Sequence, residues 1–139
     1  MFFYRYNVVE SHINCYAWKL FRWMKEGRSE EVKRLSSTIV VHKLYDPNAR
    51  EWVYFAFDEF SAMHHDIPKR PRSVPHPAMA GFCALNKMPR WVGLETTMLY
   101  VSPEFRGRGI ATRIYDAIMY DGKIVISGYS HNQKSRRLW

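Results

Sequence analysis

A strand, a glycine-containing turn and a helix follow one another between Leu99 and Ala111, and this run constrains the fold more than any other segment. The apolar strand ends at Val101, Gly107 and Gly109 occupy the turn, and the helix is predicted from Arg108 to Tyr120. Because glycine has no Cβ, the backbone can bend sharply there and bring several N–H groups toward one anion. The positive end of the helix dipole points to the same place. The segment therefore predicts a phosphate-binding turn that suits a pyrophosphate.

Two familiar phosphate-binding motifs do not fit this turn. A Walker loop needs Lys-Ser or Lys-Thr after its last glycine, whereas Ile110 and Ala111 follow Gly109. A dinucleotide fingerprint needs three spaced glycines and a downstream acidic residue, and the turn does not have this pattern. An ordinary corner between a strand and a helix remains the alternative to an anion site.

The residues of the turn resemble the acetyl-CoA signature of the GNAT superfamily of N-acetyltransferases, which runs Gln/Arg-x-x-Gly-x-Gly/Ala. The run from Arg106 to Ala111 fits this signature at every fixed position. Upstream, Glu95 and the run Leu99-Tyr100-Val101-Ser102-Pro103-Glu104 resemble the strand that precedes the signature in the family. The resemblance extends from Ala80 to Ile126, and the N-terminal half resembles the family only in outline.

This resemblance implies an α/β (α+β) fold in which helices flank a central mixed, mostly antiparallel sheet. A chain of 139 residues with 47% hydrophobic and 16% aromatic residues suits one packed domain over residues 1–139. The chain stops without the last helix and hairpin that usually complete a GNAT domain. Its C-terminal elements are therefore expected to be shortened or missing.

The hydrophobic pattern predicts the other elements of the chain. We expect a helix from His12 to Lys25, capped by Ser11, since apolar residues recur there every three or four positions and Gly27 follows. A second short helix is expected at Ser29–Leu35. Strands are expected at Phe2–Val9, Thr38–Leu44, Trp52–Phe57, Met79–Leu85, Leu94–Val101 and Ile124–Ser127, with a turn at Asp46-Pro47-Asn48.

Acetyl-CoA (coenzyme A) is the cofactor that the resemblance implies. In the family, the pantetheine arm lies against the strand that precedes the turn, which here is the backbone of Leu99, Tyr100 and Val101. The pyrophosphate is held by the amides of the signature, which here are those of Arg106, Gly107, Arg108, Gly109, Ile110, Ala111 and Thr112. The alternative for the two arginines is a solvated basic turn.

Glu95 is the candidate general base, because an amine must be neutral before it attacks a thioester and the family often carries its base at this position. Strict alternation along the strand predicts that Glu95, Thr97 and Val101 share one face. A backbone N–H near Val101 could polarise the thioester carbonyl. The alternative for Glu95 is a glutamate that pairs with Arg90 or is simply solvated.

The general acid has no clear counterpart. Many family members use a Tyr in the pattern Asn-x-x-Ala-x-x-x-Tyr, and the matching stretch Asn132–Trp139 places Trp139 at the Tyr position. An indole N–H cannot serve as that acid at neutral pH. Tyr129 or Ser130 could substitute, although strand-end structure is the alternative for both.

A net charge of +8 predicts attraction to something acidic. The segment 58–77 is rich in proline and is expected to be a long basic loop inserted into the domain, so Lys69, Arg70 and Arg72 could contact an acidic macromolecule. A nucleic-acid-binding module would rest on the same basic cluster and on Lys134–Arg137.

Two function classes follow for the chain as a whole. The first is an acetyl-CoA-dependent N-acetyltransferase that transfers an acetyl group to an amine by direct attack in a ternary complex. The second is a catalytically weak or inactive protein on a GNAT scaffold, which binds and modulates a host macromolecule. Compact sequences that end in Leu-Trp are similar to ones encoded by bacteriophages, which motivates this second class.

No metal site is predicted, since His64 and His65 are adjacent and no third ligand is suitably spaced. Cys15 and Cys83 have no partner motif and are expected to be buried thiols in a reducing cytoplasm, the host's if the protein is phage-encoded. No apolar run is long enough for a membrane span, and no signal peptide is expected. A homodimer could cover the sheet edge that the missing C-terminal elements would leave.

Overall fold

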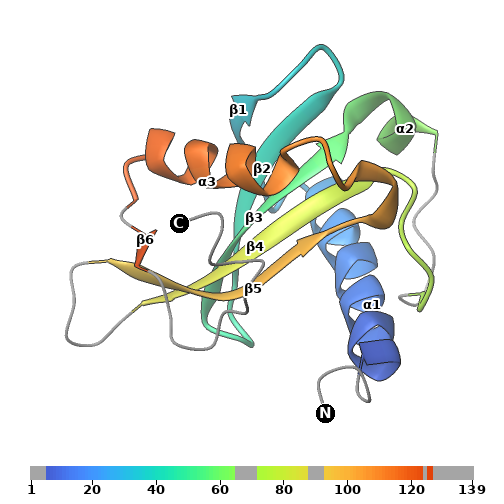
Figure 1. The fold of residues 1–139 in the computed structure, drawn as a ribbon, viewed down its shortest axis with the longest axis horizontal. Coiled ribbons are helices and arrows are strands. Elements are labelled where there is room, and N and C mark those ends of the chain that lie inside the picture. Colours follow the sequence, from blue (N-terminus) through green and yellow to red (C-terminus); the bar gives the residue numbers. More distant parts are fainter. Residues whose placement is uncertain (1–5, 65–71, 88–92, 124, 127–139) are drawn as a thin grey trace.

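A computed structural model describes residues 6–64, 72–87, 93–123 and 125–126. One six-stranded sheet, in the order β1-β2-β3-β4-β5-β6, lies between helices on its two faces (Figure 1). Adjacent strands are antiparallel except β5 and β6, which are parallel, so the predicted fold class is confirmed. The elements are α1 (Tyr6–Lys25), β1 (Glu30–Arg34), β2 (Ile39–Asp46), β3 (Glu51–Asp58), α2 (Glu59–Met63), β4 (Met79–Lys87), β5 (Leu94–Val101), the 3-10 turn η2 (Pro103–Phe105), α3 (Ile110–Tyr120) and β6 (Val125–Ile126).

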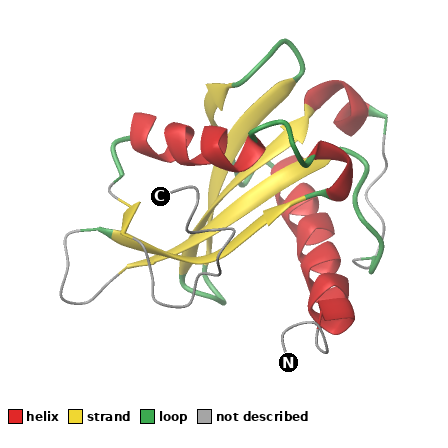
Figure 2. Cartoon of the chain, in the orientation of Figure 1, coloured by secondary structure: helices red, strands yellow, loops and turns green. Residues whose placement is uncertain are grey.

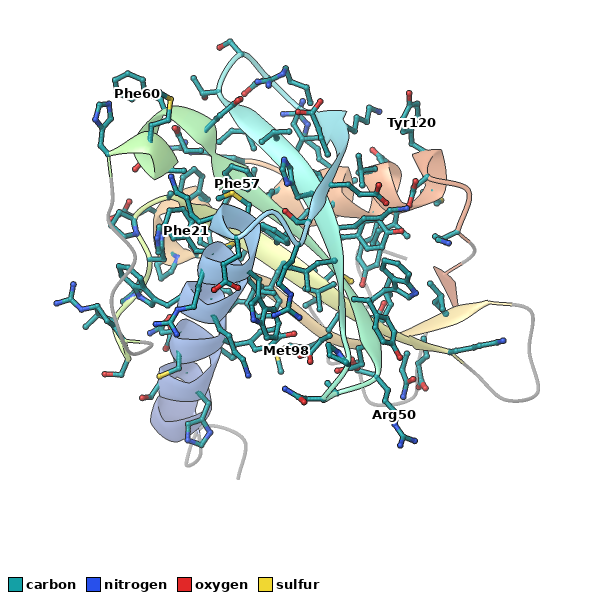
Figure 3. The ribbon with its side chains drawn as sticks, turned by 180° about the vertical axis from the view of Figure 1, so that it is seen from behind. Phe21, Arg50, Phe57, Phe60, Met98 and Tyr120 are labelled. Atoms are coloured by element: carbon teal, nitrogen blue, oxygen red, sulfur yellow. The ribbon has the colours of Figure 1, made fainter. Side chains whose placement is uncertain are left out.

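Each face of the sheet has its own hydrophobic core. On the α1 face, Leu20 and Phe21 of the helix pack with strand residues that include Phe57 and Phe82; Figure 3 shows α1 in front of the sheet in this view. On the α3 face, Ile114 and Ile118 pack with Val41, Tyr54, Cys83 and Leu85. Helices therefore cover both faces of the sheet. Successive side chains along each strand point alternately to the two faces and pack in two separate cores.

The amphipathic helix predicted at His12–Lys25 is confirmed as part of α1, and all of its predicted apolar residues pack on the sheet. The helix begins earlier than predicted, at Tyr6, so Ser11 lies inside it and is not its cap. The strand predicted at Phe2–Val9 is wrong from Tyr6 onward, and its first residues lie outside the described residues. Val9 stands four residues before Ile13, so the helical repeat extends back through aromatic and β-branched residues.

The short helix predicted at Ser29–Leu35 is also wrong, because these residues form the edge strand β1 (Figure 2). Glu30 lies opposite Lys43 of β2, and their side chains form an ion pair at 3.3 Å. Gly27, at φ +79°, ends α1 and turns the chain back toward the sheet. Pairing with β2 therefore overrides the local helix signals, as tertiary context often does in strands.

The hairpin of β2 and β3 confirms the two predicted strands and the turn between them. The buried carboxylate of Asp46 accepts backbone hydrogen bonds from Asn48 at 3.0 Å and Ala49 at 3.3 Å. Its other oxygen accepts from the Tyr16 hydroxyl of α1 at 2.8 Å. This one side chain therefore shapes the turn and ties α1 to the sheet.

The segment 58–77 is not entirely loop, since it begins with α2, which Asp58 caps by accepting from the Ser61 N–H at 2.9 Å. Lys69 and Arg70 lie outside the described residues. Further along, the carbonyl of Val74 accepts from the Trp18 indole N–H at 2.7 Å. The later part of the segment is therefore fastened to α1.

Asp121, just beyond α3, links that helix to two strands. Its carboxylate accepts hydrogen bonds from Lys43 at 2.8 Å and from the Tyr54 hydroxyl at 2.6 Å. Burial acts to raise the pKa of Asp121, but the hydrogen bonds from Lys43 and Tyr54 outweigh it and lower the pKa below its ordinary value. The C-terminal end of α3 is thus held to β2 and β3.

We expect Asp121→Asn to lower the free energy of unfolding by about 1–3 kcal/mol at pH 7, since it weakens two charge-assisted hydrogen bonds. Because the folded pKa lies below the unfolded one, the carboxylate stabilises the fold above about pH 4 and loses this effect as the pH falls through the folded value. Urea titrations at several pH values should therefore show the difference from wild type shrinking in acid. Asp116→Asn, at an exposed site on the same helix, is the control and should change little.

Candidate functional site

The predicted phosphate-binding turn forms a tight connection between β5 and α3. Val101 ends the strand, η2 makes one turn, and two glycines lead into the helix at Ile110. Gly107 and Gly109 have φ values of +81° and +71°, which L side chains rarely adopt. A Cβ on either glycine would meet no atom within 4 Å, so the turn faces open space. Both glycines are thus required by backbone conformation, as the sequence predicted.

The N–H groups of this turn are open at its surface. Among the described residues, no hydrogen bond is donated by the backbone N–H groups of Gly107, Arg108, Gly109, Ile110, Ala111 or Thr112. The first amide of α3 with a backbone acceptor is that of Arg113, which donates to the carbonyl of Gly109 at 3.1 Å. Consecutive amides at a helix N-terminus, with no side-chain cap, leave several hydrogen-bond donors together at the positive end of the helix dipole, an arrangement that favours an anion.

Two arginines surround these amides with positive charge. The Arg106 Nε donates to the Val101 carbonyl at 3.0 Å, and the Arg108 guanidinium lies 5.3 Å from the centre of the Phe105 ring. Both arginines are exposed. Their charges are therefore oriented by local contacts and remain accessible to an anionic ligand.

Two residues that were not predicted from the sequence hold the turn in place. Ser102 is buried, and its hydroxyl donates to the Met79 carbonyl at 2.6 Å while its N–H donates to the Ala80 carbonyl at 2.9 Å. A Cβ on Gly81 would lie 2.6 Å from the carbonyl oxygen of Tyr100, so only glycine lets β5 approach β4 so closely there. A serine in a turn and a glycine within a strand are common, so neither residue points to this site in the sequence. Both hold the turn in place only because β4 pairs with β5.

The candidate cofactor-binding strand residues lie on different faces of β5. Leu99 and Val101 are half-buried and pack with the core on the α3 face, whereas Tyr100 is buried in the core on the α1 face. This is the alternation expected of a strand. The described part of β6 pairs with the beginning of β5, at Leu94 and Glu95.

Glu95 does not share a face with Val101, so this expectation is wrong. Ala84 lies opposite Met98 and Leu85 lies opposite Thr96, which leaves Thr97 as an extra residue in a β-bulge. One inserted residue reverses the alternation, so Glu95 faces α1 whereas Val101 faces α3. No periodicity argument detects a bulge, because the extra residue becomes visible only when the partner strand is known.

The bulge places polar side chains on the α1 face of the sheet. Thr97 is exposed, and its hydroxyl donates to the carboxylate of Glu51 at the start of β3. Glu95 is half-buried and lies opposite Asn86 of β4. Within the part of the chain that the structure describes, Glu95 makes no ion pair.

A buried cluster lies on the other face of the bulge. The hydroxyls of Thr96 and Tyr115 are hydrogen-bonded at 3.1 Å, and the Cys83 thiol lies 4.0 Å from the Thr96 oxygen. Burial raises the pKa of Cys83 to about 12, so its thiol stays protonated and unreactive at neutral pH. Cys83 is thus a buried thiol as predicted, whereas Cys15 is only half-buried.

Several candidate residues fall outside the described part of the chain. Tyr129, Ser130 and Trp139 lie outside the described residues, as do Lys69 and Arg70. His64 is exposed, with its ring against Phe60, and the described ranges contain no group of His, Cys, Asp or Glu side chains arranged to hold a metal ion. None of the helices over these ranges is long and apolar enough to cross a membrane.

A shallow open hollow of about 330 Å³ lies along α1, lined by His12, Cys15, Tyr16 and Lys19. Tyr16 faces the sheet, since its ring meets Phe82 edge-on at 5.5 Å. The hollow is therefore on the α1 side of the sheet, the side that Glu95 faces.

A family model described as the acetyltransferase (GNAT) family matches residues 44–139. This range includes β3, β4, β5, the glycine turn and α3. Comparison with curated proteins and comparison with solved structures each gave no match.

Proposed function

Because the chain belongs to the acetyltransferase (GNAT) family, we propose that it is an acetyl-CoA-dependent N-acetyltransferase that transfers an acetyl group to an amine by direct attack in a ternary complex. The observation that carries this proposal is the run of open amides from Gly107 to Thr112 at the N-terminus of α3. A helix N-terminus with unpaired amides and two flanking arginines is complementary to the pyrophosphate of coenzyme A, because it offers positive charge and hydrogen-bond donors to a negatively charged acceptor group.

The residues of the turn fit this ligand in three respects. Gly107 and Gly109 leave space where side chains would otherwise stand, as the open surroundings of an added Cβ indicate. Arg106 and Arg108 supply exposed positive charge for the phosphates. The backbone of Leu99, Tyr100 and Val101 would hold the pantetheine arm by strand-like hydrogen bonds, as the family resemblance implies.

Acetyl-CoA, when bound, supplies an acetyl group activated as a thioester. The part of this chain is to orient that group and to produce a neutral amine beside it. Glu95 is the base in our proposal, since its half-buried carboxylate can accept the proton of an acceptor ammonium on the α1 face of β5. Backbone N–H groups near Val101 would stabilise charge that develops on the carbonyl oxygen.

Calorimetry on the purified chain tests the ligand assignment. We expect acetyl-CoA to bind with a micromolar Kd, and a concentration of about 100 times Kd to stabilise the fold by about 2.7 kcal/mol and so to raise Tm by several degrees. Sodium acetate at the same concentration is the control and should leave Tm unchanged. The absence of both heat and Tm shift at millimolar acetyl-CoA would refute the proposal.

Turnover requires a second measurement. A panel of amines and peptides with free N-termini would be incubated with acetyl-CoA, and release of the free thiol of coenzyme A would be followed with a thiol-reactive dye. Acceptor-dependent release supports the transferase. Tight binding of acetyl-CoA without release for any acceptor would instead favour the catalytically inactive scaffold.

A further inference from the structure

The second half of α1 carries positive side chains that the proposed acetyl transfer does not use. We define the α1 basic surface as Lys19, Arg22, Lys25, Arg28 and Arg72. Lys25, Arg28 and Arg72 are exposed and the other two are half-buried, while Glu26 is the acidic residue among them in sequence. This surface lies on the α1 side of the sheet, whereas the glycine turn leads into α3 on the other side (Figures 1 and 3).

Aromatic rings hold several of these cations in place. The Lys19 ammonium lies 4.9 Å and the Arg28 guanidinium 4.4 Å from the centre of the Trp23 ring. Lys25 lies 5.3 Å from the Phe21 ring centre, and Arg72 lies 5.6 Å from that of Trp18. In the described part of the chain, none of Lys19, Lys25, Arg28 and Arg72 forms an ion pair. Ordered cations without a carboxylate partner are ready to bind an external anion.

The helix dipole accounts for only part of this charge. Arg22 and Lys25 stand in the last turn of α1, where a positive charge stabilises the helix. Lys19 is further from the helix end, Arg28 lies beyond it, and Arg72 comes from a distant segment. Arg72 nevertheless lies over the ring of Trp18 of α1, and the helix dipole does not account for this contact.

The dimensions of the surface suit a polymer of phosphates. Lys19 and Lys25 are six residues apart, so they lie about 9 Å apart along the helix axis. A DNA duplex presents about five phosphate charges over such a length. These phosphates belong to both strands together, so cations arranged in this way can contact several phosphates of the duplex at once.

The surface carries charge but little exposed apolar area. In the described part of the chain, the large exposed apolar side chains are Tyr45, Phe60, Met63, Val74, Met98, Met119 and Tyr120. None of them belongs to α1, and Val74 stands beside Arg72, since its carbonyl accepts from Trp18, over whose ring Arg72 lies. A protein interface normally has an apolar centre, and an amphipathic helix on a membrane inserts an apolar face. Charge alone is sufficient to bind a nucleic acid backbone.

We propose that the α1 basic surface binds the phosphate backbone of a nucleic acid without reading its sequence. The bond partners are phosphodiester oxygens, which accept from the Arg22, Arg28 and Arg72 guanidinium groups and from the two lysine ammonium groups. This site is separate from the proposed acetyl-CoA turn, so either can fail without the other.

Fluorescence anisotropy with a labelled 20-base-pair DNA duplex and a 20-nucleotide RNA tests the proposal. For wild type between 50 and 200 mM salt, we expect log K to fall linearly with log salt, with a slope of about −4 for four or five phosphate contacts. Changing Lys19, Arg22, Lys25 and Arg28 together to Gln should weaken binding at 50 mM salt by at least about tenfold and bring the slope near zero. Acetyl-CoA binding by this variant should stay within about twofold of wild type, because the ligand turn is untouched.

The control variant removes the same charge elsewhere, with Lys33, Arg50, Lys87 and Lys123 changed to Gln. If both variants lose nucleic-acid affinity equally, the proposal is overturned, since binding would then depend on the net charge of the protein and not on the α1 basic surface. Two further outcomes would also overturn it: no binding of either nucleic acid by wild type at 50 mM salt, or displacement of the bound nucleic acid by 1 mM coenzyme A. Tighter binding to vesicles with 30% phosphatidylserine, or to polyglutamate, than to nucleic acid would overturn it in favour of a membrane or an acidic protein.

The thermal melt of each variant shows whether it is folded. If the fourfold variant is unfolded, Lys25→Glu with Arg28→Glu replaces it, because both side chains are exposed. This pair should weaken binding at least about tenfold while Tm stays within a few degrees of wild type, and unchanged affinity in the folded pair would overturn the proposal.

Discussion

Replacing Glu95 with Gln should lower kcat for acetyl transfer at pH 7 by roughly 10²-fold or more, in the range that a general base contributes. The amide cannot accept the proton of the acceptor ammonium, so only the small fraction of amine that is already neutral can react. Acetyl-CoA affinity should stay within about twofold, since the amides assigned to the phosphates in our proposal are unchanged. Initial rates at saturating acetyl-CoA, together with calorimetry, give both quantities.

The pH profile separates a base from a merely structural glutamate. In the variant, the rate should keep rising with pH toward the pKa of the acceptor amine, because hydroxide and water then deprotonate it. Glu31→Gln, on the edge strand β1, is the matched control and should leave kcat unchanged. If Glu95→Gln retains wild-type kcat at pH 7, Glu95 is not the base.

Replacing Gly109 with Glu should weaken acetyl-CoA binding by at least about 100-fold. Gly109 is the N-cap residue of α3 and has φ +71°, so a side chain there is strained and adds a carboxylate beside the amides that would receive the pyrophosphate. The negative charge and the bulk of the new side chain therefore both lower the affinity for acetyl-CoA. The Kd from calorimetry measures the effect directly.

Gly122 provides a control of matched geometry. It has φ +82°, an added Cβ there meets nothing within 4 Å, and it lies just beyond the other end of α3. Gly122→Glu therefore introduces the same charge and similar backbone strain far from the turn. Similar loss of acetyl-CoA binding in both variants would argue against the turn as the ligand site, and Gly109→Ala separates strain from charge.

The parts of the site that depend on local sequence were predictable. Gly107 and Gly109 stand where the backbone needs positive φ, and the α1 stripe from Ile13 to Met24 packs on the sheet as its spacing indicates. These features follow from conformational preferences of single residues and from helical periodicity. The family model agrees with the motif over the same region.

The errors came from contacts between segments that are distant in sequence. Glu30 to Arg34 carries the signals of a helix start but forms a strand, because β2 offers it a partner edge. Glu95 faces α1 because β4 leaves Thr97 unpaired. The partner of a strand and the register of the pairing both depend on a second segment that is distant in sequence. The residue spacing within one segment therefore could not predict them.

The bulge at Thr97 has a kinetic consequence for the proposed reaction. The strand residues and the turn assigned to the acetyl donor adjoin the α3 layer, whereas the carboxylate assigned to the amine lies on the α1 face. Donor and acceptor then approach one strand from opposite sides, and neither has to pass the other on its way in. One inserted residue thereby gives β5 two working faces, and in the proposed reaction neither the acetyl donor nor the amine has to bind before the other.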